Sequence, residues 1–319
     1  MELVPGSERV VVDALSDPVR GAVRWAPAKS LWIGSMTTIA LVFAPLTFSW
    51  SALLLFLGTC AVTLCAGHSV GMHRRLIHNS FQCPLWLEHV CVYLGVLVGM
   101  AGPIGMMRIH DMRDWAQRQP ACHDFFAHRA GFWRDAWHQL HCELRLDRPP
   151  SFQLEPRVAN DRVYAFLERH WMAQQLPWAL LFVAIGGLPW LVWGICARVA
   201  VCVTGHWLVG HYAHREGGMT WQVEGACVQG YDIRIAGLIS MGESWHNNHH
   251  AYPGSAKLGL EPGQVDPGWW LLSTFRMLGL AWNIVLPADL PNRPALRRVA
   301  LRGQGCAAVA WLVARRWAR

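Results

Sequence analysis

Two stretches of the chain carry histidines at spacings that are typical of metal ligands. The stretch GHSVGMHRRLIHNSF places His73 and His78 five residues apart, and GESWHNNHHAYPG supplies His246, His249 and His250. Neutral imidazoles bind iron, zinc, copper and nickel. Because positions i, i+3 and i+4 share one face of a helix, the second stretch can aim its rings at one point or at two neighbouring points.

The spacing of His73 and His78 is harder to reconcile with a single metal. Five residues along an α-helix leave two side chains about 140° apart around the axis. The pair therefore serves one metal only where the helix frays, or else it serves two metals. A third stretch, GHWLVGHYAHREG, adds His211 and His214. Three other histidines are interpreted as ordinary core or interface residues: His89, His170 and His206.

The stretch RIHDMRDWAQ contains one histidine, His110, followed by Arg113 and Asp114. A carboxylate binds iron in many sites that hold two iron ions. Arginine has no lone pair to offer and would repel the cation. His123 and Asp124, just downstream, are further candidate ligands. Alternatively, Arg113 and Asp114 pair with each other beside a site that is completed elsewhere. Further candidates in the same region are His128, His138 and His141.

The segments between these histidines are too apolar for most soluble domains. Hydrophobic residues make up 53% of the chain and charged residues only 15%. A membrane-spanning helix needs about 20 apolar residues, and fewer in a tight hairpin. We expect one helical hairpin of spans 31–50 and 52–67 and a second of spans 176–196 and 199–212. Buried helices of a soluble protein are the alternative, but runs this long and uncharged are rare in soluble cores.

A further apolar run, residues 85–107, contains Glu88 and His89 and is broken by Gly102 and Pro103. If this run crossed the membrane, the histidines on its two sides would lie on opposite faces. We therefore expect an interfacial or re-entrant helix here.

The net charge of +7 comes almost entirely from arginine, since the only lysines are Lys29 and Lys257. Arginines crowd residues 69–172 and the chain after Asn292, which by the positive-inside rule places these segments and the N-terminus in the cytoplasm. Anionic lipid headgroups explain the charge without nucleic acid. Ten cysteines without a C-x-x-C pair indicate a reducing compartment, and residues 1–29 contain no cleavable signal.

These features predict an all-α integral membrane protein with four transmembrane helices in two hairpins and a histidine-rich helical cap in the cytosol. Residues 1–29 form a cytosolic segment, residues 30–285 the membrane domain with its cap, and residues 286–319 a basic tail.

The histidine pattern resembles the membrane fatty acid desaturase family, and most of all its acyl-CoA (Δ9-type) branch. The likeness covers roughly residues 30–285, and it is most specific in residues 242–260, which read like the third histidine box of the family. The segment HRRLIHNSF resembles the first box. The segment HWLVGHYAHREG places an additional family ligand at His214.

The resemblance implies four transmembrane helices and a cytosolic cap in which histidines hold two iron ions. The irons activate O2, and an acyl chain in a bent tunnel acquires a cis double bond. The implied partners are a fatty acyl chain on CoA, acyl carrier protein or lipid, O2, membrane lipid, and an electron donor such as ferredoxin or a cytochrome b5-type protein. The implied ligands are His73, His78, His110, His214, His246, His249 and His250, with Asp114, His123 and Asp124 as candidate replacements.

The chain departs from the family at its second box, which has the pattern H-x-x-H-H. Here Arg113 and Asp114 take the last two histidine positions, and Gly210 takes the place of a family asparagine. We expect a rebuilt two-iron site that desaturates an acyl chain, because a dead site has no physical reason to retain a complete third box. The alternatives are a hydroxylase, acetylenase or decarboxylase, a site with a single metal, or a non-catalytic lipid-binding protein. We expect location in the inner (cytoplasmic) membrane, with the active site facing the cytoplasm.

Overall fold

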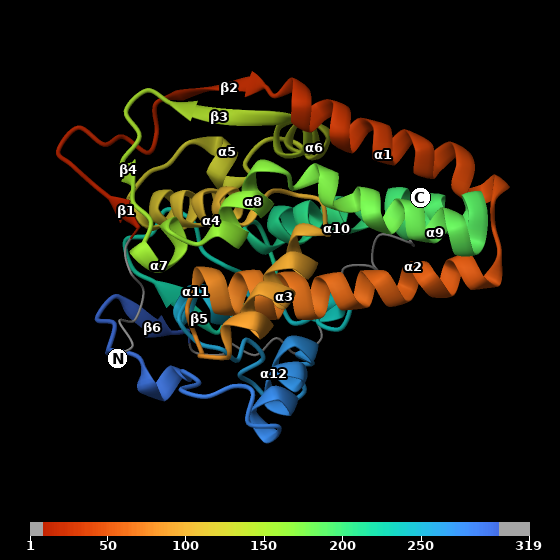
Figure 1. Cartoon of the computed structure of the whole chain (residues 1–319). Coiled ribbons are helices and arrows are strands. Elements are labelled where there is room, and N and C mark those ends of the chain that lie inside the picture. Colours follow the sequence, from red (N-terminus) through yellow and green to blue (C-terminus); the bar gives the residue numbers. More distant parts are fainter. Residues whose placement is uncertain (1–8, 300–319) are drawn as a thin grey trace, which may run out of the picture.

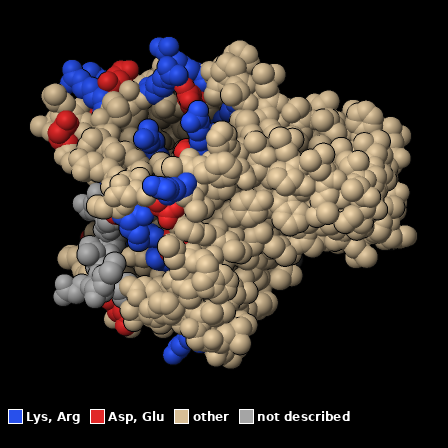
Figure 2. Space-filling view, in the orientation of Figure 1, with Lys and Arg blue, Asp and Glu red and all other residues tan. Residues whose placement is uncertain are grey.

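The computed structural model describes residues 9–299, which form a mostly helical body (Figure 1). Long helices extend together from one side of a cap built from shorter helices and strands (Figure 1). Figure 2 shows that the charged side chains gather over the cap, whereas the visible face of the helical lobe carries almost none. The elements of the lobe are α1 (Pro27–Leu46), α2 (Trp50–Val62), η1 (Thr63–Ile77), η2 (Met172–Gln174), α9 (Gln175–Leu191), η3 (Val192–Ala197) and α10 (Arg198–Ala213).

The first hairpin turns between α1 and α2, where Ser49 caps the second helix. The hydroxyl oxygen of Ser49 accepts a hydrogen bond from the backbone N–H of Ala52 at 3.2 Å. Helix α2 then continues without a break into the π-helix η1, so the helical segment reaches Ile77. This is ten residues beyond the expected end of the span at residue 67. The extension carries the histidine-bearing end of η1 directly into the cap.

The second hairpin bends at Gly187, next to the interruption that the sequence indicates near Leu188 and Pro189, whereas the other interruption indicated near Arg198 does not occur. Gly187 has φ 63° and ψ −155°, a left-handed conformation that glycine adopts at little cost, and Pro189 follows it. The helix runs unbroken through Arg198 because that guanidinium is buried and satisfied. Its donors bond to the Gly194 carbonyl at 2.8 Å, to the Gln175 side chain at 2.5 Å, and to the Leu97 carbonyl.

Three helical segments within residues 9–299 are long and apolar enough to cross a membrane. They are Pro27–Leu46, Trp50–Ile77 and Met172–Ala213. The last of these contains the bend at Gly187, so it consists of two arms. The length and apolar surface of these segments are those of a membrane protein.

Helix α3 (Leu85–Val96) is only 12 residues long, too short to cross a bilayer. It packs tightly along η1, as a β-carbon at Gly67 would come within 2.4 Å of the Gly95 nitrogen. A β-carbon at Gly71 would come within 2.5 Å of the Cys91 carbonyl carbon. Small residues at this contact let the two helix backbones approach closely. The apolar run of residues 85–107 therefore does not form a spanning helix, in agreement with the interfacial or re-entrant helix that the sequence predicts.

The cap surrounds the inner end of η1. Its largest apolar cluster includes Met72, Val96, Met107 and Tyr164, all fully buried. The helical elements of the cap are α4 (Pro103–Arg118), α5 (Asp124–Ala127), α6 (Phe132–His141), α7 (Pro156–Ala159), α8 (Arg162–Arg169), η4 (Arg234–Ala236), α11 (His246–Ala251), α12 (Pro267–Met277) and η5 (Pro287–Asp289).

Three small antiparallel sheets of two strands each correct the expectation of an all-α fold. Strands from the N-terminal segment and from the tail pair with strands of the cap, so both ends of the described chain are folded onto it. The pairs are β1 (Val10–Val11) with β4 (Ser151–Phe152), β2 (Gly21–Trp25) with β3 (Cys142–Leu146), and β5 (Trp221–Val223) with β6 (Leu296–Arg298). The rest of the expected tail, residues 300–319, lies outside the described residues.

A buried ion pair fastens η1 to the C-terminal part of the cap. Nη2 of Arg74 lies 2.8 Å from Oδ1 of Asp266, and both side chains are at most 2% exposed. The other carboxylate oxygen of Asp266 accepts the backbone N–H groups of Leu258 at 2.9 Å and of Gly259 at 3.1 Å. The loop that follows the stretch GESWHNNHHAYPG is thereby held against η1.

We predict that Asp266→Asn destabilises the protein strongly. Its amide nitrogen cannot accept the backbone N–H groups, and its neutral side chain leaves the buried Arg74 with one carboxylate partner fewer, since Glu243 remains at 3.1 Å. Removing one partner of a buried ion pair costs about 3–5 kcal/mol. Thermal unfolding in detergent measures the effect, with Asp124→Asn as the control, since the Asp124 side chain is 69% exposed. Equal unfolding temperatures for the two variants would contradict this account.

Candidate metal centre

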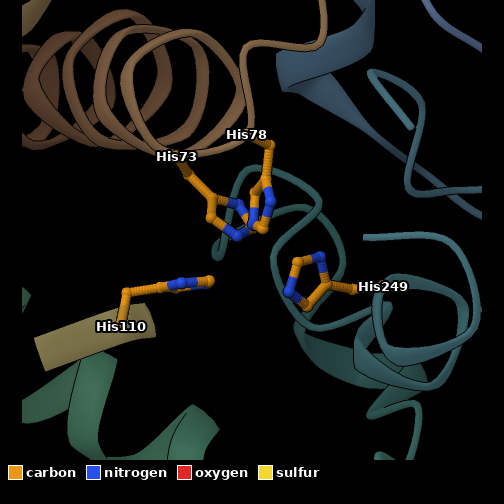
Figure 3. A group of neighbouring side chains, drawn as sticks. All are labelled: His73, His78, His110 and His249. Atoms are coloured by element: carbon orange, nitrogen blue, oxygen red, sulfur yellow. The ribbon is translucent and has the colours of Figure 1, made fainter. Parts of the chain in front are cut away.

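Four histidines from distant parts of the chain converge in the cap (Figure 3). This first group consists of His73, His78, His110 and His249, and one nitrogen of each lies within 4.8 Å of the others. Figure 3 shows the rings pointing toward one another from the end of η1, from α4 and from α11.

The π-helical geometry of η1 explains how His73 and His78 serve the same point. In a π-helix the hydrogen bonds run between residues five apart, and the backbone N–H of His78 bonds to the His73 carbonyl at 3.1 Å. Residues five apart therefore lie one turn above each other, and the two ring centroids are 4.8 Å apart. Sequence reasoning placed the pair on an α-helix and missed this alignment. The available signal was the five-residue repeat of His68, His73 and His78.

Carboxylates orient two rings of the first group. Nδ1 of His73 lies 2.6 Å from Oε2 of Glu243, and Nδ1 of His110 lies 3.2 Å from Oδ1 of Asp111. These contacts leave the Nε2 atoms of both rings free for the centre of the group. Carboxylates play this supporting role beside histidines that bind metals.

Apart from Nδ1 of His73, which faces Glu243, two ring nitrogens of the first group are buried without a hydrogen-bond partner. They are Nε2 of His78 and Nδ1 of His249. Leaving a buried polar atom unpaired costs about 1–3 kcal/mol, so native structures rarely tolerate it without a purpose. Burial, followed by the neighbouring histidines, holds the pKa of both rings well below the ordinary value. The rings are therefore neutral, and their lone pairs fit a metal ion.

A second group lies beside the first and consists of His214, His246 and His250. Nε2 of His246 lies 3.0 Å from Nε2 of His214 and 3.1 Å from Nε2 of His250. Burial lowers the pKa of His214 and His246 far below the ordinary value, and it lowers that of His250 to about 4. These three nitrogens also suit a metal ion, although the group has one imidazole fewer than the first.

The short helix α11 divides its histidines between the two groups. His246 and His250, one helical turn apart, belong to the second group, and His249 belongs to the first. The sequence left open whether the three rings meet at one point or two, and the structure has two.

Asn247 and Asn248 anchor α11 between these histidines. The Asn247 side chain accepts two backbone N–H groups at 2.8 Å and donates to the Trp221 and Gly230 carbonyls at 2.7 Å. The Asn248 amide donates to the Leu258 carbonyl at 2.8 Å. The asparagines thus fix the orientation of the helix that joins the two groups.

Asp114 lies close to both groups, although its oxygens fall outside the 4.8 Å clusters. It pairs with Arg118 at 3.0 Å and lines a cavity of about 1000 Å³ together with His78. Burial alone would raise its pKa, but His110, Arg118 and His250 hold that pKa well below its ordinary value. Asp114 is therefore an anion at neutral pH beside the histidines.

Arg113 does not pair with Asp114, so that alternative interpretation is wrong. Its guanidinium instead donates to Oε1 of Gln139 at 2.8 Å. The structure also leaves His123 and Asp124 apart from both groups. Nδ1 of His123 accepts the backbone N–H of Phe125 at 3.1 Å, and the exposed Asp124 faces Arg129 at 3.6 Å.

Sequence reasoning did not assemble a third cluster, which centres on the buried Asp135. Its Oδ2 lies 2.9 Å from Nδ1 of His128, 2.7 Å from Nδ1 of His211 and 2.8 Å from Nε1 of Trp207. Burial alone would raise the pKa of Asp135, but the hydrogen bonds and charges of these neighbours lower it below the ordinary value. The ring of His128 also lies parallel to that of His214 in the second group, at a centroid distance of 5.3 Å.

Comparison with known proteins identifies relatives of this chain. Residues 48–257 match the family described as fatty acid desaturase. An sn-1 stearoyl-lipid 9-desaturase of Anabaena variabilis is 32% identical, over 80% of this chain and 94% of that protein. An sn-2 palmitoyl-lipid 9-desaturase of Nostoc sp. (strain 36) is 31% identical, over 84% and 93%. An acyl-CoA C20 Delta5-desaturase of Anemone leveillei is 29% identical, over 82% and 83%.

Proposed function

The chain belongs to the fatty acid desaturase family, and we propose that it introduces a cis double bond into a fatty acyl chain with O2 and two iron ions. The observation that carries this proposal is the pair of adjacent histidine groups, which share the helix α11. Two neighbouring groups of imidazoles match two metal ions better than one.

The reaction requires a metal because an alkyl C–H bond offers no handle to acid–base chemistry. Bound iron supplies the redox chemistry with O2 that removes hydrogen from the acyl chain. His73, His78, His110 and His249 would hold one ion. His214, His246 and His250 would hold the other. The surrounding cap buries His73, His214 and His249 and leaves the other four rings half-buried.

We assign Asp114 as a further ligand of the second group. The anionic side chain stands on α4, four residues after His110 of the first group, and its charge acts on His250. A carboxylate oxygen there would offset the missing imidazole of the second group. His123 and Asp124, the other candidate replacements, would need a rearrangement of α5 to reach either group.

The substrate in this proposal is an acyl chain carried by a lipid, CoA or acyl carrier protein. The relatives named above include two acyl-lipid desaturases and one acyl-CoA desaturase, which supports the first two carriers. A ferredoxin or a cytochrome b5-type protein would supply the electrons.

The proposed placement has four crossings of the inner membrane, with both termini and both histidine groups on the cytoplasmic side. The bend at Gly187 supports two crossings within Met172–Ala213. The charged side chains around the cap and the bare helical lobe support the orientation (Figure 2).

Reporter fusions test this placement. Fusions at residues 50 and 190 should report the outer side of the membrane, because they lie at the two hairpin tips. Fusions at residues 125 and 230 should report the cytoplasm. A fusion at residue 125 that reports the outer side would overturn the placement and separate the histidines that the proposal requires on one side.

Metal analysis and lipid analysis together test the function. Protein purified without oxygen should contain two irons per chain, and expression should add monounsaturated acyl chains to the membrane lipids, seen by mass spectrometry. His249→Ala removes a buried imidazole, so iron and product should fall together. His170→Ala is the control, because His170 is exposed and outside both groups. Full iron in His249→Ala would refute the assignment, and one iron in the unmutated protein would favour a single-metal site.

Asp114→Asn tests the carboxylate ligand. It keeps the size of the side chain and removes the charge, so we expect iron affinity or turnover to fall by about tenfold or more. Arg113→Gln should have a smaller effect. Arg118→Gln removes the ion-pair partner of Asp114 but leaves its carboxylate, so iron should be largely retained. If Asp114→Asn and Asp114→Ala both keep full iron and turnover, Asp114 is not a ligand.

A further inference from the structure

His128 carries a ring nitrogen that its own hydrogen bonds do not explain. The side chain is 1% exposed, and its Nε2 is buried without a hydrogen-bond partner. Its other nitrogen, Nδ1, bonds to Oδ2 of Asp135 at 2.9 Å. A histidine whose Nδ1 proton is held by a carboxylate has its lone pair on Nε2.

The Asp135 cluster itself is not a metal site, although its three side chains lie close enough together. Nε1 of Trp207 bonds to the same carboxylate oxygen at 2.8 Å, and an indole nitrogen only donates. Oδ2 of Asp135 therefore receives three N–H groups, two from imidazoles and one from the indole. A cation at that oxygen would meet the proton of Trp207. The cluster instead fixes the direction of the His128 ring.

The free nitrogen of His128 faces the helical turn that carries His214. A β-carbon built at Gly210 would lie 3.4 Å from Nε2 of His128. The carbonyl of Gly210 lies 2.7 Å from Nδ1 of His214, which leaves Nε2 of His214 facing His246. A β-carbon at position 210 would thus be in van der Waals contact with the His128 ring, with Nη1 of Arg113 at 3.9 Å from the same point.

The ring separation is that of a shared site. The centroids of His128 and His214 are 5.3 Å apart. Neighbouring rings within the two groups are separated by 4.6 Å, for His214 and His246, to 5.8 Å, for His110 and His249. The second group has only three imidazoles, whereas the first has four. His128 thus stands at ligand spacing beside the group that lacks one.

We propose that His128, oriented by Asp135, supplies a further nitrogen donor to the metal site of His214, His246 and His250. This inference rests on the proposed function. In this inference the Asp135–His128 pair belongs to the metal site. The hydrogen bonds of Asp135 to His211 and Trp207 hold that pair in place.

The test compares His128→Ala with His211→Ala in the full-length protein, purified in detergent and loaded with Fe(II) without oxygen. Both variants remove one imidazole from Asp135, but His211 makes no ring contact with the second group. Iron per chain and chelator competition measure binding, and X-ray absorption counts the imidazoles per iron. For His128→Ala we expect one of the two irons to bind at least about tenfold more weakly and the imidazole count to fall. His211→Ala, which removes a support of Asp135 but no proposed ligand, should weaken iron binding much less and leave the imidazole count unchanged.

His128→Gly with added imidazole separates a ligand from a packing residue. Free imidazole in the vacated space should restore the second iron if His128 supplies a nitrogen, while the unfolding temperature controls for damage to the fold. Two tightly bound irons with an unchanged imidazole count in both His128 variants would overturn this inference and leave the proposed function intact. Absence of iron from the unmutated protein would overturn the proposed function as well.

Discussion

The structure depends on holding seven imidazole rings at close range in one region of the cap. Protonated rings at these separations would repel one another, and burial makes each charge still more costly. The chain meets this constraint by seating the rings on elements that are themselves locked by buried polar contacts. The Arg74–Asp266 pair fixes the end of η1 and the loop after α11, and the side chains of Asn247 and Asn248 fix α11. The supporting carboxylates Glu243 and Asp111 then set the direction of individual rings.

The long apolar helices lead directly into the part of the cap that carries the two histidine groups. Helix α2 enters η1 without a break, and the bent segment that ends at Ala213 delivers His214 on the residue that follows. The polar residues that the sequence places near these ends do not terminate the helices, because Arg74, Arg75 and Arg198 are buried with partners. Displacing the first hairpin would therefore move His73 and His78 of the first group, and displacing the second would move His214 of the second group.

The sequence predicted the parts whose signals are local, and it missed those that depend on partners far along the chain. Apolar runs predicted the hairpins, and the spacing in WHNNHH predicted ring convergence. The π-helix could not be predicted because packing against α3 and the cap stabilises it, and local sequence propensity does not reflect such contacts. The three small sheets escaped because each pairs short strands from distant segments, such as β5 with β6. The role of Asp135 required three partners, 7, 72 and 76 residues away, to be placed around one oxygen.

The stretch RIHDMRDWAQ places an arginine beside the candidate metal ligands. In place of two imidazoles the chain has one cation and one anion, and the structure separates them: Asp114 turns to Arg118, and Arg113 to Gln139. The guanidinium is thus held by a neutral amide beside Gly210, within 3.9 Å of where a β-carbon would stand. Asp114 keeps its negative charge on the side of the second group, where it would offset the charge of a bound cation. The charge of Arg113 still reaches His214 and His128, where it helps to lower the pKa of both rings and so disfavours their protonation.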